Sequence, residues 1–191
     1  MRRPNLIALR GMANREELLD MRAGEGSAAV QHMERLVAIE EIKNLKARRI
    51  RAMDEKRWDD YEAMHAEDHV SDTYGGEPAV GARANVRKLA AVLADIVSVH
   101  HAHTPEIEIT SDTTATGVWA MEDMLFWQQG DEQHWLHGYG HYHERYRKGP
   151  DGWQFVYRKL TRLRVDASPG GKLGDLNVQR LSSPSTPQPE E

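Results

Sequence analysis

Cysteine is absent from this sequence of 191 residues, and so is any long run of apolar residues. The absence of cysteine excludes disulfide bonds, a catalytic thiol and zinc sites built on thiolate ligands. No segment approaches the ~20 consecutive apolar residues that a membrane-spanning helix needs. The apolar residues between positions 5 and 10 form too short a run for the core of a signal peptide. We therefore expect a soluble, cytoplasmic protein without a membrane partner.

An excess of positive charge is also lacking. The net charge is −5 and the isoelectric point is about 6.1. The basic residues between positions 46 and 51 are interrupted by apolar residues on a predicted helix. A protein that binds nucleic-acid phosphates through charge needs clustered lysines and arginines. The charge pattern therefore predicts no nucleic-acid partner.

The length and composition favour one domain with an extension at each end. We expect an N-terminal extension over residues 1–30, in which residues 24–27 (Gly-Glu-Gly-Ser) break a short helix. The central domain is expected over residues 31–166. Residues 167–191 are rich in serine, proline and glycine, and this composition predicts a flexible tail.

The apolar pattern of the central domain changes from a helical period to alternation. Helices are predicted over about 29–56, 58–64 and 86–96, with a short strand at 69–73 between the second and third. Long strands then follow, with turn residues at 129–131 and 149–152, over 98–110, 114–128, 134–148 and 153–166. Helices followed by an antiparallel meander indicate an α+β fold. We expect a cone-shaped, curved antiparallel sheet whose N-terminal helices roof a hydrophobic cavity.

Histidine is unusually frequent, with ten residues in the chain. Seven of them lie on predicted strands: His100, His101, His103, His134, His137, His141 and His143. Because side chains alternate along a strand, His100 and His101 must point to opposite faces. His137, Tyr139, His141 and His143 share one face, and Gly138, Gly140, Tyr142 and Glu144 share the other.

Two interpretations of the strand histidines remain open. In the first, His101 and His103 join His141 and His143 in a site of four imidazoles for zinc, copper or iron. In the second, the face rich in histidine and tyrosine packs against another subunit of a homodimer or homotrimer. The second is favoured, because no cysteine is available and no carboxylate is assigned to the set. We therefore expect no bound metal and an activity that survives EDTA.

Asp54 and His100 form a second constellation. Asp54 closes the first predicted helix, and His100 opens the first long strand. If the helix roofs the sheet, a carboxylate could fix the imidazole tautomer and leave the other ring nitrogen free as a base. The plainer interpretation is an ordinary aspartate at a helix end beside a core histidine, and spacing alone favours it.

Three groups of motifs resemble SnoaL-like domains of the nuclear-transport-factor-2-like superfamily. The first group reads IKNLKARR at 42–49, MDEKRWD at 53–59 and MHAED at 64–68. The second reads VHHAHTPEIEI at 99–109 and DTTA at 112–115, and the third reads GW at 152–153 and LTR at 160–162. The resemblance covers roughly residues 36–166. It implies a cystatin-like fold, and it leaves the reaction open because the superfamily also contains non-catalytic proteins.

Within the superfamily, the sequence is similar to scytalone dehydratase, bile-acid 7α-dehydratase and hexachlorocyclohexane dehydrochlorinase. Those enzymes use an Asp–His dyad without a cofactor, and their dyad residues match Asp54 and His100. Lyases that release formaldehyde from diarylpropanes and phenylcoumarans belong to the same superfamily. Arg49 occupies a position where several relatives carry lysine or tyrosine. An arginine can bind an oxyanion or carboxylate but cannot readily donate a proton.

These inferences lead to a cofactor-independent lyase as the expected function. His100 would act as the base, with Asp54 and Arg49 as further catalytic residues, on a small, hydrophobic, hydroxylated aromatic or polycyclic substrate. Water or formaldehyde would be eliminated. The residues expected to line the substrate site are Tyr74, Trp119, Met121, Asp123 and Tyr142. The alternatives are a non-catalytic ligand-binding or assembly module, and an isomerase or cyclase that acts on a polycyclic ketone.

Overall fold

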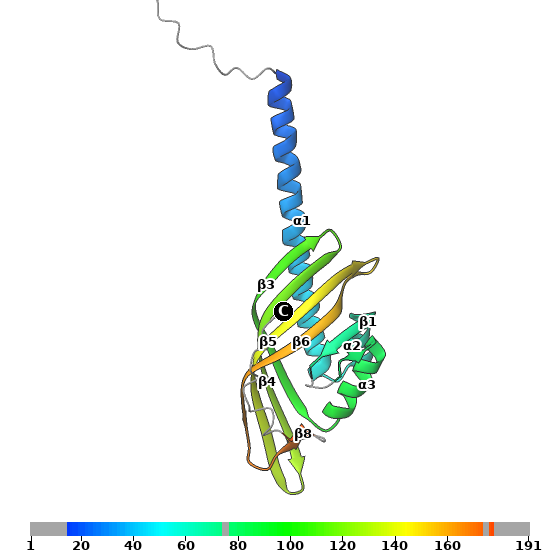
Figure 1. The fold of residues 1–191 in the computed structure, drawn as a ribbon, viewed down its shortest axis with the longest axis vertical. Coiled ribbons are helices and arrows are strands. Elements are labelled where there is room, and N and C mark those ends of the chain that lie inside the picture. Colours follow the sequence, from blue (N-terminus) through cyan, green and yellow to red (C-terminus); the bar gives the residue numbers. More distant parts are fainter. Residues whose placement is uncertain (1–14, 74–76, 174–175, 178–191) are drawn as a thin grey trace, which may run out of the picture. The chain divides into compact units, whose positions relative to one another are not determined.

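The computed structural model describes residues 15–73, 77–173 and 176–177 (Figure 1). The chain divides into two units, Met1–Ala38 and Ile39–Glu191. Helix α1 (Arg15–Asp54) continues through residues 24–27, where the sequence predicts a break. A glycine inside a helix costs only about 1 kcal/mol, and helical turns on both sides can offset that cost. The predicted break is therefore wrong.

The second unit contains two further helices and one large sheet. Helix α2 (Trp58–Ala63) and helix α3 (Ala82–Leu93) follow α1, in the order that the apolar pattern predicts. Helix α3 buries one stripe, formed by Ala82, Val86, Leu89 and Leu93. This spacing of three and four residues places the stripe on one face of the helix. None of the described helices is long and apolar enough to cross a membrane.

The large sheet has the strand order β2-β1-β6-β5-β4-β3. Its strands are β1 (His65–Asp72), β2 (Ala79–Val80), β3 (Val97–Ser111), β4 (Thr114–Gln129), β5 (Glu132–Gly149) and β6 (Gly152–Ala167). Strands β3 to β6 form the expected antiparallel meander, whereas β1 pairs with β6 in parallel. The long strands curve across the helices in Figure 1. The α+β fold with helices beside a curved sheet is confirmed.

Two short strands lie in the segment that the sequence predicts as a flexible tail. Strand β7 (Lys172–Leu173) pairs with strand β8 (Leu176–Asn177) in an antiparallel ladder. Ser168, just after β6, is tied to β5 through its backbone N–H, which donates to the carbonyl oxygen of Trp135 at 3.0 Å.

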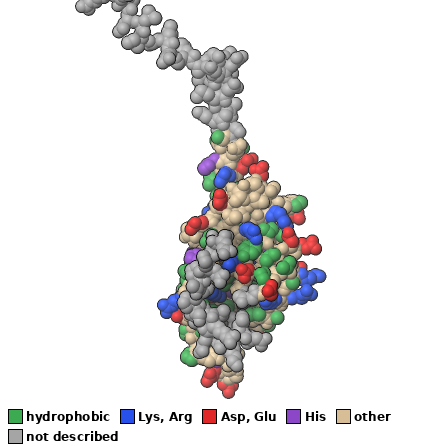
Figure 2. Space-filling model, in the orientation of Figure 1, with side chains coloured by type: hydrophobic (Ala, Val, Ile, Leu, Met, Phe, Trp, Pro, Cys, Tyr) green, Lys and Arg blue, Asp and Glu red, His purple; other side chains and the backbone are tan. Residues whose placement is uncertain are grey.

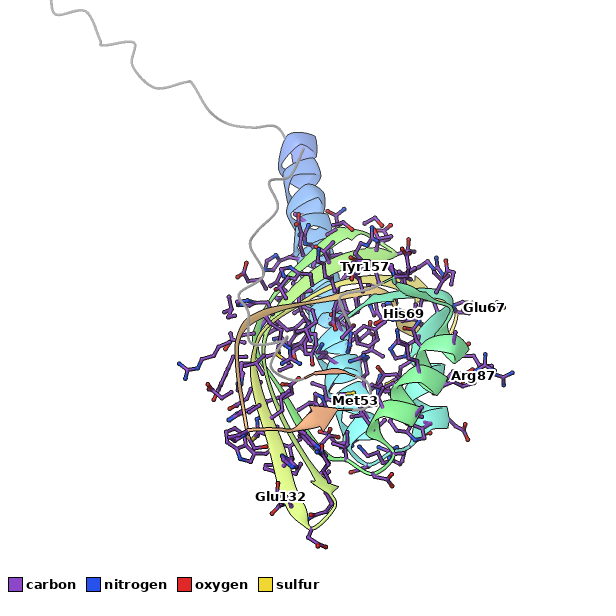
Figure 3. All side chains as sticks on the ribbon, turned by 60° about the horizontal axis from the view of Figure 1, so that its bottom comes forward. Met53, Glu67, His69, Arg87, Glu132 and Tyr157 are labelled. Atoms are coloured by element: carbon purple, nitrogen blue, oxygen red, sulfur yellow. The ribbon has the colours of Figure 1, made fainter. Side chains whose placement is uncertain are left out.

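The apolar core joins helix α3 and the end of α1 to the sheet. It contains Met53, Val86, Leu93, Leu125, Trp127 and Leu136, among others. In Figure 3, Met53 and His69 lie inside the body of the unit, whereas Glu67, Arg87 and Glu132 lie at its surface. On the face seen in Figure 2, acidic and basic side chains are interspersed rather than segregated.

The alternation of burial along β4 and β5 separates an inner from an outer face. On β4 the odd-numbered positions from Ala115 to Trp127 are buried, and on β5 the even-numbered positions from His134 to Tyr146 are buried. His137, Tyr139, His141 and His143 are partly exposed on the outer face, and Gly138, Gly140, Tyr142 and Glu144 are buried on the inner face. Both predicted groupings are confirmed.

The outer face leads to a prediction about assembly. His137, Tyr139 and His141 are partly exposed there, and Trp135 on the same face is 41% exposed. A sheet face with this many aromatic and imidazole rings is expected to be covered by a second subunit. Light scattering at micromolar concentration should therefore show a homodimer or homotrimer, and Trp135→Glu should shift it toward monomer. A monomeric wild-type protein would contradict this expectation.

Candidate active site

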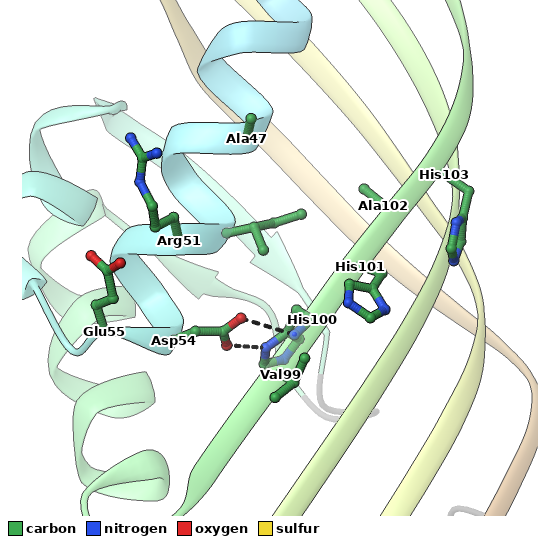
Figure 4. Close-up of a pocket in the computed structure, with 10 residues that line it drawn as sticks. Ala47, Arg51, Asp54, Glu55, Val99, His100, His101, Ala102 and His103 are labelled. Carbon is green, nitrogen blue, oxygen red and sulfur yellow. Dashed lines mark hydrogen bonds and ion pairs between the residues drawn. The ribbon is translucent and has the colours of Figure 1, made fainter.

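Asp54 and His100 are in direct contact, although they are 46 residues apart in sequence. The Oδ1 atom of Asp54 lies 2.6 Å from Nδ1 of His100, and Oδ2 accepts the backbone N–H of His100 at 2.9 Å (Figure 4). Ser98 donates its hydroxyl to Oδ1 at 2.9 Å. The carboxylate is thus held by three donors that all come from strand β3.

The end of helix α1 explains how Asp54 reaches β3. The backbone N–H of Arg57 donates to the carbonyl of Ala52 at 2.8 Å, and that of Lys56 donates to Met53 at 3.2 Å. These two bonds form a Schellman motif, in which one residue adopts a left-handed conformation. That residue is Lys56, with φ of 59°. The motif ends the helix at Asp54. It also directs the Lys56 side chain toward β3, where its ammonium donates to Ser98 Oγ at 3.0 Å.

The protonation of the pair follows from this geometry. Burial raises the pKa of Asp54, but hydrogen bonds and charge from His100, with help from Ser98, outweigh burial and lower it below the usual value. An ionised carboxylate can only accept, so Nδ1 of His100 carries the proton. Among the described residues, no hydrogen bond to the other ring nitrogen, Nε2, is found. The pair can therefore present a free imidazole nitrogen as a base.

An open groove of about 530 Å³ runs along the contact between α1 and the edge strand β3. Its lining on α1 includes Ala47, Ile50 and Arg51, and its lining on β3 runs from Val99 to His103. Asp54 and His100 both border it (Figure 4). A small molecule in this groove could approach the pair from solvent.

The predicted substrate-site residues occupy the inner face of the sheet. Trp119, Met121, Asp123 and Tyr142 are each less than 5% exposed. Asp123 is the cross-strand neighbour of His100, so the two side chains lie on the same face. Arg162 binds Asp123 through two hydrogen bonds of 2.6 Å each. The fifth predicted residue, Tyr74, lies outside the described part of the chain.

The sequence profile of the chain shows the family to which it belongs. Residues 34–159 match the SnoaL-like domain. The chain belongs to the SnoaL-like domain family. The matched segment includes Asp54, His100, strands β1 to β5 and the first half of β6.

Solved structures share the fold of this SnoaL-like domain. A presumed scytalone dehydratase from Novosphingobium aromaticivorans is 20% identical with a TM-score of 0.64, over 74% of this chain and 98% of that one. A hexachlorocyclohexane dehydrochlorinase is 14% identical with a TM-score of 0.65, over 73% and 94%. An NTF2-like protein with a cystatin-like fold, also from Novosphingobium aromaticivorans, is 22% identical with a TM-score of 0.57, over 80% and 92%. At these identities the likeness establishes the fold alone.

Arg49 of the SnoaL-like domain is buried away from the Asp54–His100 pair. Its Nε donates to Nε2 of His65 at 3.0 Å, and its Nη2 donates to the hydroxyl of Tyr61. Burial, and then the Arg49 charge, lower the pKa of His65 well below its usual value, so this imidazole is neutral. The remaining nitrogen of Arg49, Nη1, is buried and has no hydrogen-bond partner among the described residues.

Sequence reasoning missed a second buried network on the inner face. The Nζ of Lys46 lies 2.5 Å from Oε1 of Glu144, and the hydroxyl of Tyr146 donates to Oε2 at 2.6 Å. Trp119 donates its indole N–H to the same Tyr146 hydroxyl at 2.8 Å. Burial lowers the pKa of Lys46 to about 7. Burial raises the pKa of Glu144, but the charges of Lys46 and Arg49 and the hydrogen bonds from Lys46 and Tyr146 together outweigh burial and lower it. The interior beneath α1 is therefore partly ionic rather than purely hydrophobic.

The histidines weighed as metal ligands divide into two separate groups on the outer face. His101 and His103 lie beside Glu122, with the imidazole Nδ1 of His101 3.3 Å from Oε2. His141 and His143 form a separate pair with ring centroids 6.4 Å apart, and Nε2 of His143 contacts the hydroxyl of Thr161 at 3.0 Å. The four imidazoles do not converge as a single set. The carboxylate absent from the sequence interpretation is present at Glu122.

Gly138 leaves space for the Asp123–Arg162 pair. A Cβ atom at this position would lie 1.8 Å from Nη1 of Arg162 and 2.3 Å from Oδ1 of Asp123. We expect Gly138→Ala to displace this pair and to lower the free energy of unfolding by about 1–3 kcal/mol, as overpacking in a core does. Urea denaturation measures the change. Gly149→Ala is the matched control on the same strand, because its nearest neighbours would be 3.9 Å away. Equal losses in the two variants would contradict the steric explanation.

Proposed function

We propose that this SnoaL-like domain is a cofactor-independent lyase in which His100 is the general base. The observation that supports this role is the contact between Asp54 and Nδ1 of His100, which leaves Nε2 free to take a proton. Three donors on Asp54 hold the carboxylate in place, so the imidazole is oriented before substrate binds. The proposed substrate is a hydroxylated aromatic or polycyclic small molecule.

Two eliminations are compatible with one base at this position. In a dehydration, Nε2 takes a proton from carbon, the C–H electrons form a double bond, and hydroxide leaves the neighbouring carbon with a proton as water. In a formaldehyde release, Nε2 takes the proton of a hydroxymethyl group. The O–H electrons then form the formaldehyde C=O bond, and the carbon–carbon bond to the hydroxymethyl group breaks. The electrons of that bond form a C=C bond to the adjacent carbon, from which the leaving group departs with its electron pair. Both reactions need only proton transfer by the protein.

The buried cations of the inner face would bind the oxygen atoms of the substrate. Arg49 offers its unpaired Nη1, and Arg162 lies beside His100 through its pair with Asp123. A guanidinium remains charged, so it can stabilise an oxyanion or phenolate without giving up a proton. The proton for the leaving group would then come from the imidazolium of His100 itself, which regenerates the free base.

A substrate screen with mass detection tests the proposal. Purified wild-type protein and His100→Ala are incubated with a panel of hydroxylated aromatics and steroids, and binding is followed in parallel by thermal shift. The proposal expects a product formed by wild type alone that is lighter than its substrate by one water, or by one formaldehyde together with any leaving group that does not stay attached to the product. A product of unchanged mass would favour the isomerase or cyclase. Tight ligands without any product would favour a binding module.

A further inference from the structure

Glu122 is surrounded by imidazoles on the outer face of the sheet, the face opposite the His100 side chain. His101 and His103 are on the edge strand β3, Glu122 is on β4 directly opposite His101, and His137 is on β5. Three neighbouring strands thus contribute four side chains to one place. Their spacing is set by backbone register, because i and i+2 residues and their cross-strand neighbours share a face.

The distances in this cluster are those between ligands around a small metal ion. Nδ1 of His101 and Nε2 of His103 lie 3.3 and 3.7 Å from Oε2 of Glu122. Ligand atoms 2.0–2.1 Å from a tetrahedral zinc are about 3.3–3.4 Å from one another. Ligand atoms of His101, His103 and Glu122 all lie within 4.8 Å of each other. Little movement is needed to bring these three to metal-binding distances.

The chemistry of the cluster also suits a transition metal. Nε2 of His137 lies 2.7 Å from Oε1 of Glu122, and the Tyr139 hydroxyl lies 3.2 Å from Nδ1 of the same ring. This pattern places the proton of His137 on Nε2, where a metal would replace it. The two carboxylate oxygens of Glu122 face the rings of His101 and His137, at 3.3 and 2.7 Å, and supply the negative charge that a cation site needs. Imidazole nitrogens combined with one carboxylate select zinc, nickel or copper over magnesium or calcium.

We propose that His101, His103, Glu122 and His137 bind one divalent transition metal ion, such as Zn²⁺, on the outer face of the sheet. The ion would tie the edge strand β3 to β4 and β5. Because His100 is on β3, the same ion would hold the strand that carries the proposed base. His101 and His103 also line the groove beside the Asp54–His100 pair. The proposed reaction needs no metal, and the inference does not depend on that reaction. It revises the expectation of a metal-free protein, which relied on the absence of cysteine and on the lack of an assigned carboxylate.

Zinc titration of the full chain tests this site. The protein is prepared without a polyhistidine tag, stripped with EDTA and titrated with ZnCl₂ by isothermal calorimetry. We expect one equivalent to bind to wild type and to raise its melting temperature, because a ligand that binds only the folded state stabilises it. Loss of an outer-shell partner typically weakens metal binding 10–100-fold, so His103→Ala and Glu122→Gln, which remove direct ligands, should weaken it at least about tenfold.

His143→Ala is the matched control, because it removes an imidazole from the same face without touching the cluster. It should bind zinc as wild type does, and Co²⁺ added to wild type should give the intense visible absorption of a tetrahedral site. Circular dichroism verifies that each variant is folded. Failure of folded wild type to bind zinc would overturn the proposal. So would equal zinc binding by His103→Ala and wild type, or equal weakening by His143→Ala.

Discussion

Replacing His100 by alanine is expected to lower kcat by ~10²–10⁴-fold on any substrate that the protein converts, because general base catalysis typically contributes that much. KM and the substrate dissociation constant should change little. The imidazole takes up the proton in the transition state and not in the substrate complex, so the loss of rate should appear in kcat and not in KM. In this variant Asp54 keeps the backbone N–H of residue 100 and the Ser98 hydroxyl as donors, so the end of α1 should stay in place against β3. Steady-state kinetics and calorimetry on the same substrate separate the two effects.

Asp54→Asn should cost somewhat less than His100→Ala. The amide still reaches His100 and Ser98, but it can donate to Nδ1 and so favour the wrong tautomer. His143→Ala is the control for the loss of an imidazole elsewhere and should keep the wild-type kcat. If His100→Ala keeps the wild-type rate, His100 is only a core histidine. The search for the base would then move to His65, His141 and Asp123.

Replacing Lys46 by methionine is expected to lower the free energy of unfolding by about 3–5 kcal/mol, the usual cost of leaving one partner of a buried ion pair alone. The side chains of Lys46 and Glu144 are 1% and 0% exposed, so water cannot solvate the remaining carboxylate. Tyr146 would still donate to Glu144, but a hydroxyl does not neutralise the charge. Urea denaturation at neutral pH measures the loss.

Two further variants show whether the Lys46 effect is electrostatic. Lys46→Met combined with Glu144→Gln removes both charges and keeps an acceptor for the Tyr146 hydroxyl, so it should recover most of the stability. Lys43→Met breaks the exposed pair with Glu40 on the same helix and should cost less than about 1 kcal/mol. If the double variant is no more stable than Lys46→Met, the loss arises from packing rather than from an unpaired charge.

Much of the fold could be predicted because its elements are long and regularly patterned. Each of the four long strands begins and ends within two residues of its predicted bounds. Strand β1 begins at His65, four residues earlier than predicted. Its first residues are mostly polar and show no apolar alternation, although the first two are buried. Its parallel pairing with β6 joins segments that are far apart in the sequence, so a local sequence pattern cannot predict it. The extension of α1 through residues 24–27 was missed because glycine was given too much weight as a helix breaker.

The candidate site was predictable only for residues whose own position in the sequence pointed to a role. Asp54 and His100 were found through their positions at a helix end and a strand start, together with the family resemblance. The pair of Lys46 and Glu144 was missed because the two residues are 98 positions apart in the sequence. The signal for Lys46 was its position beside Arg49 on the otherwise apolar face of α1. Glu122 was missed because strand register, and not sequence spacing, brings it to His101.

The tautomer of His100 is the most direct measure of the central claim, because a base must have a free lone pair on the nitrogen that faces substrate. Nitrogen NMR of ¹⁵N-histidine-labelled protein, with the His100 signals assigned by their absence in His100→Ala, reports which ring nitrogen carries the proton. At a pH where this imidazole is neutral, we expect Nδ1 to be protonated toward Asp54 and Nε2 to be unprotonated. An Nε2-protonated ring in wild type, unchanged in Asp54→Asn, would contradict the role of His100 as the base.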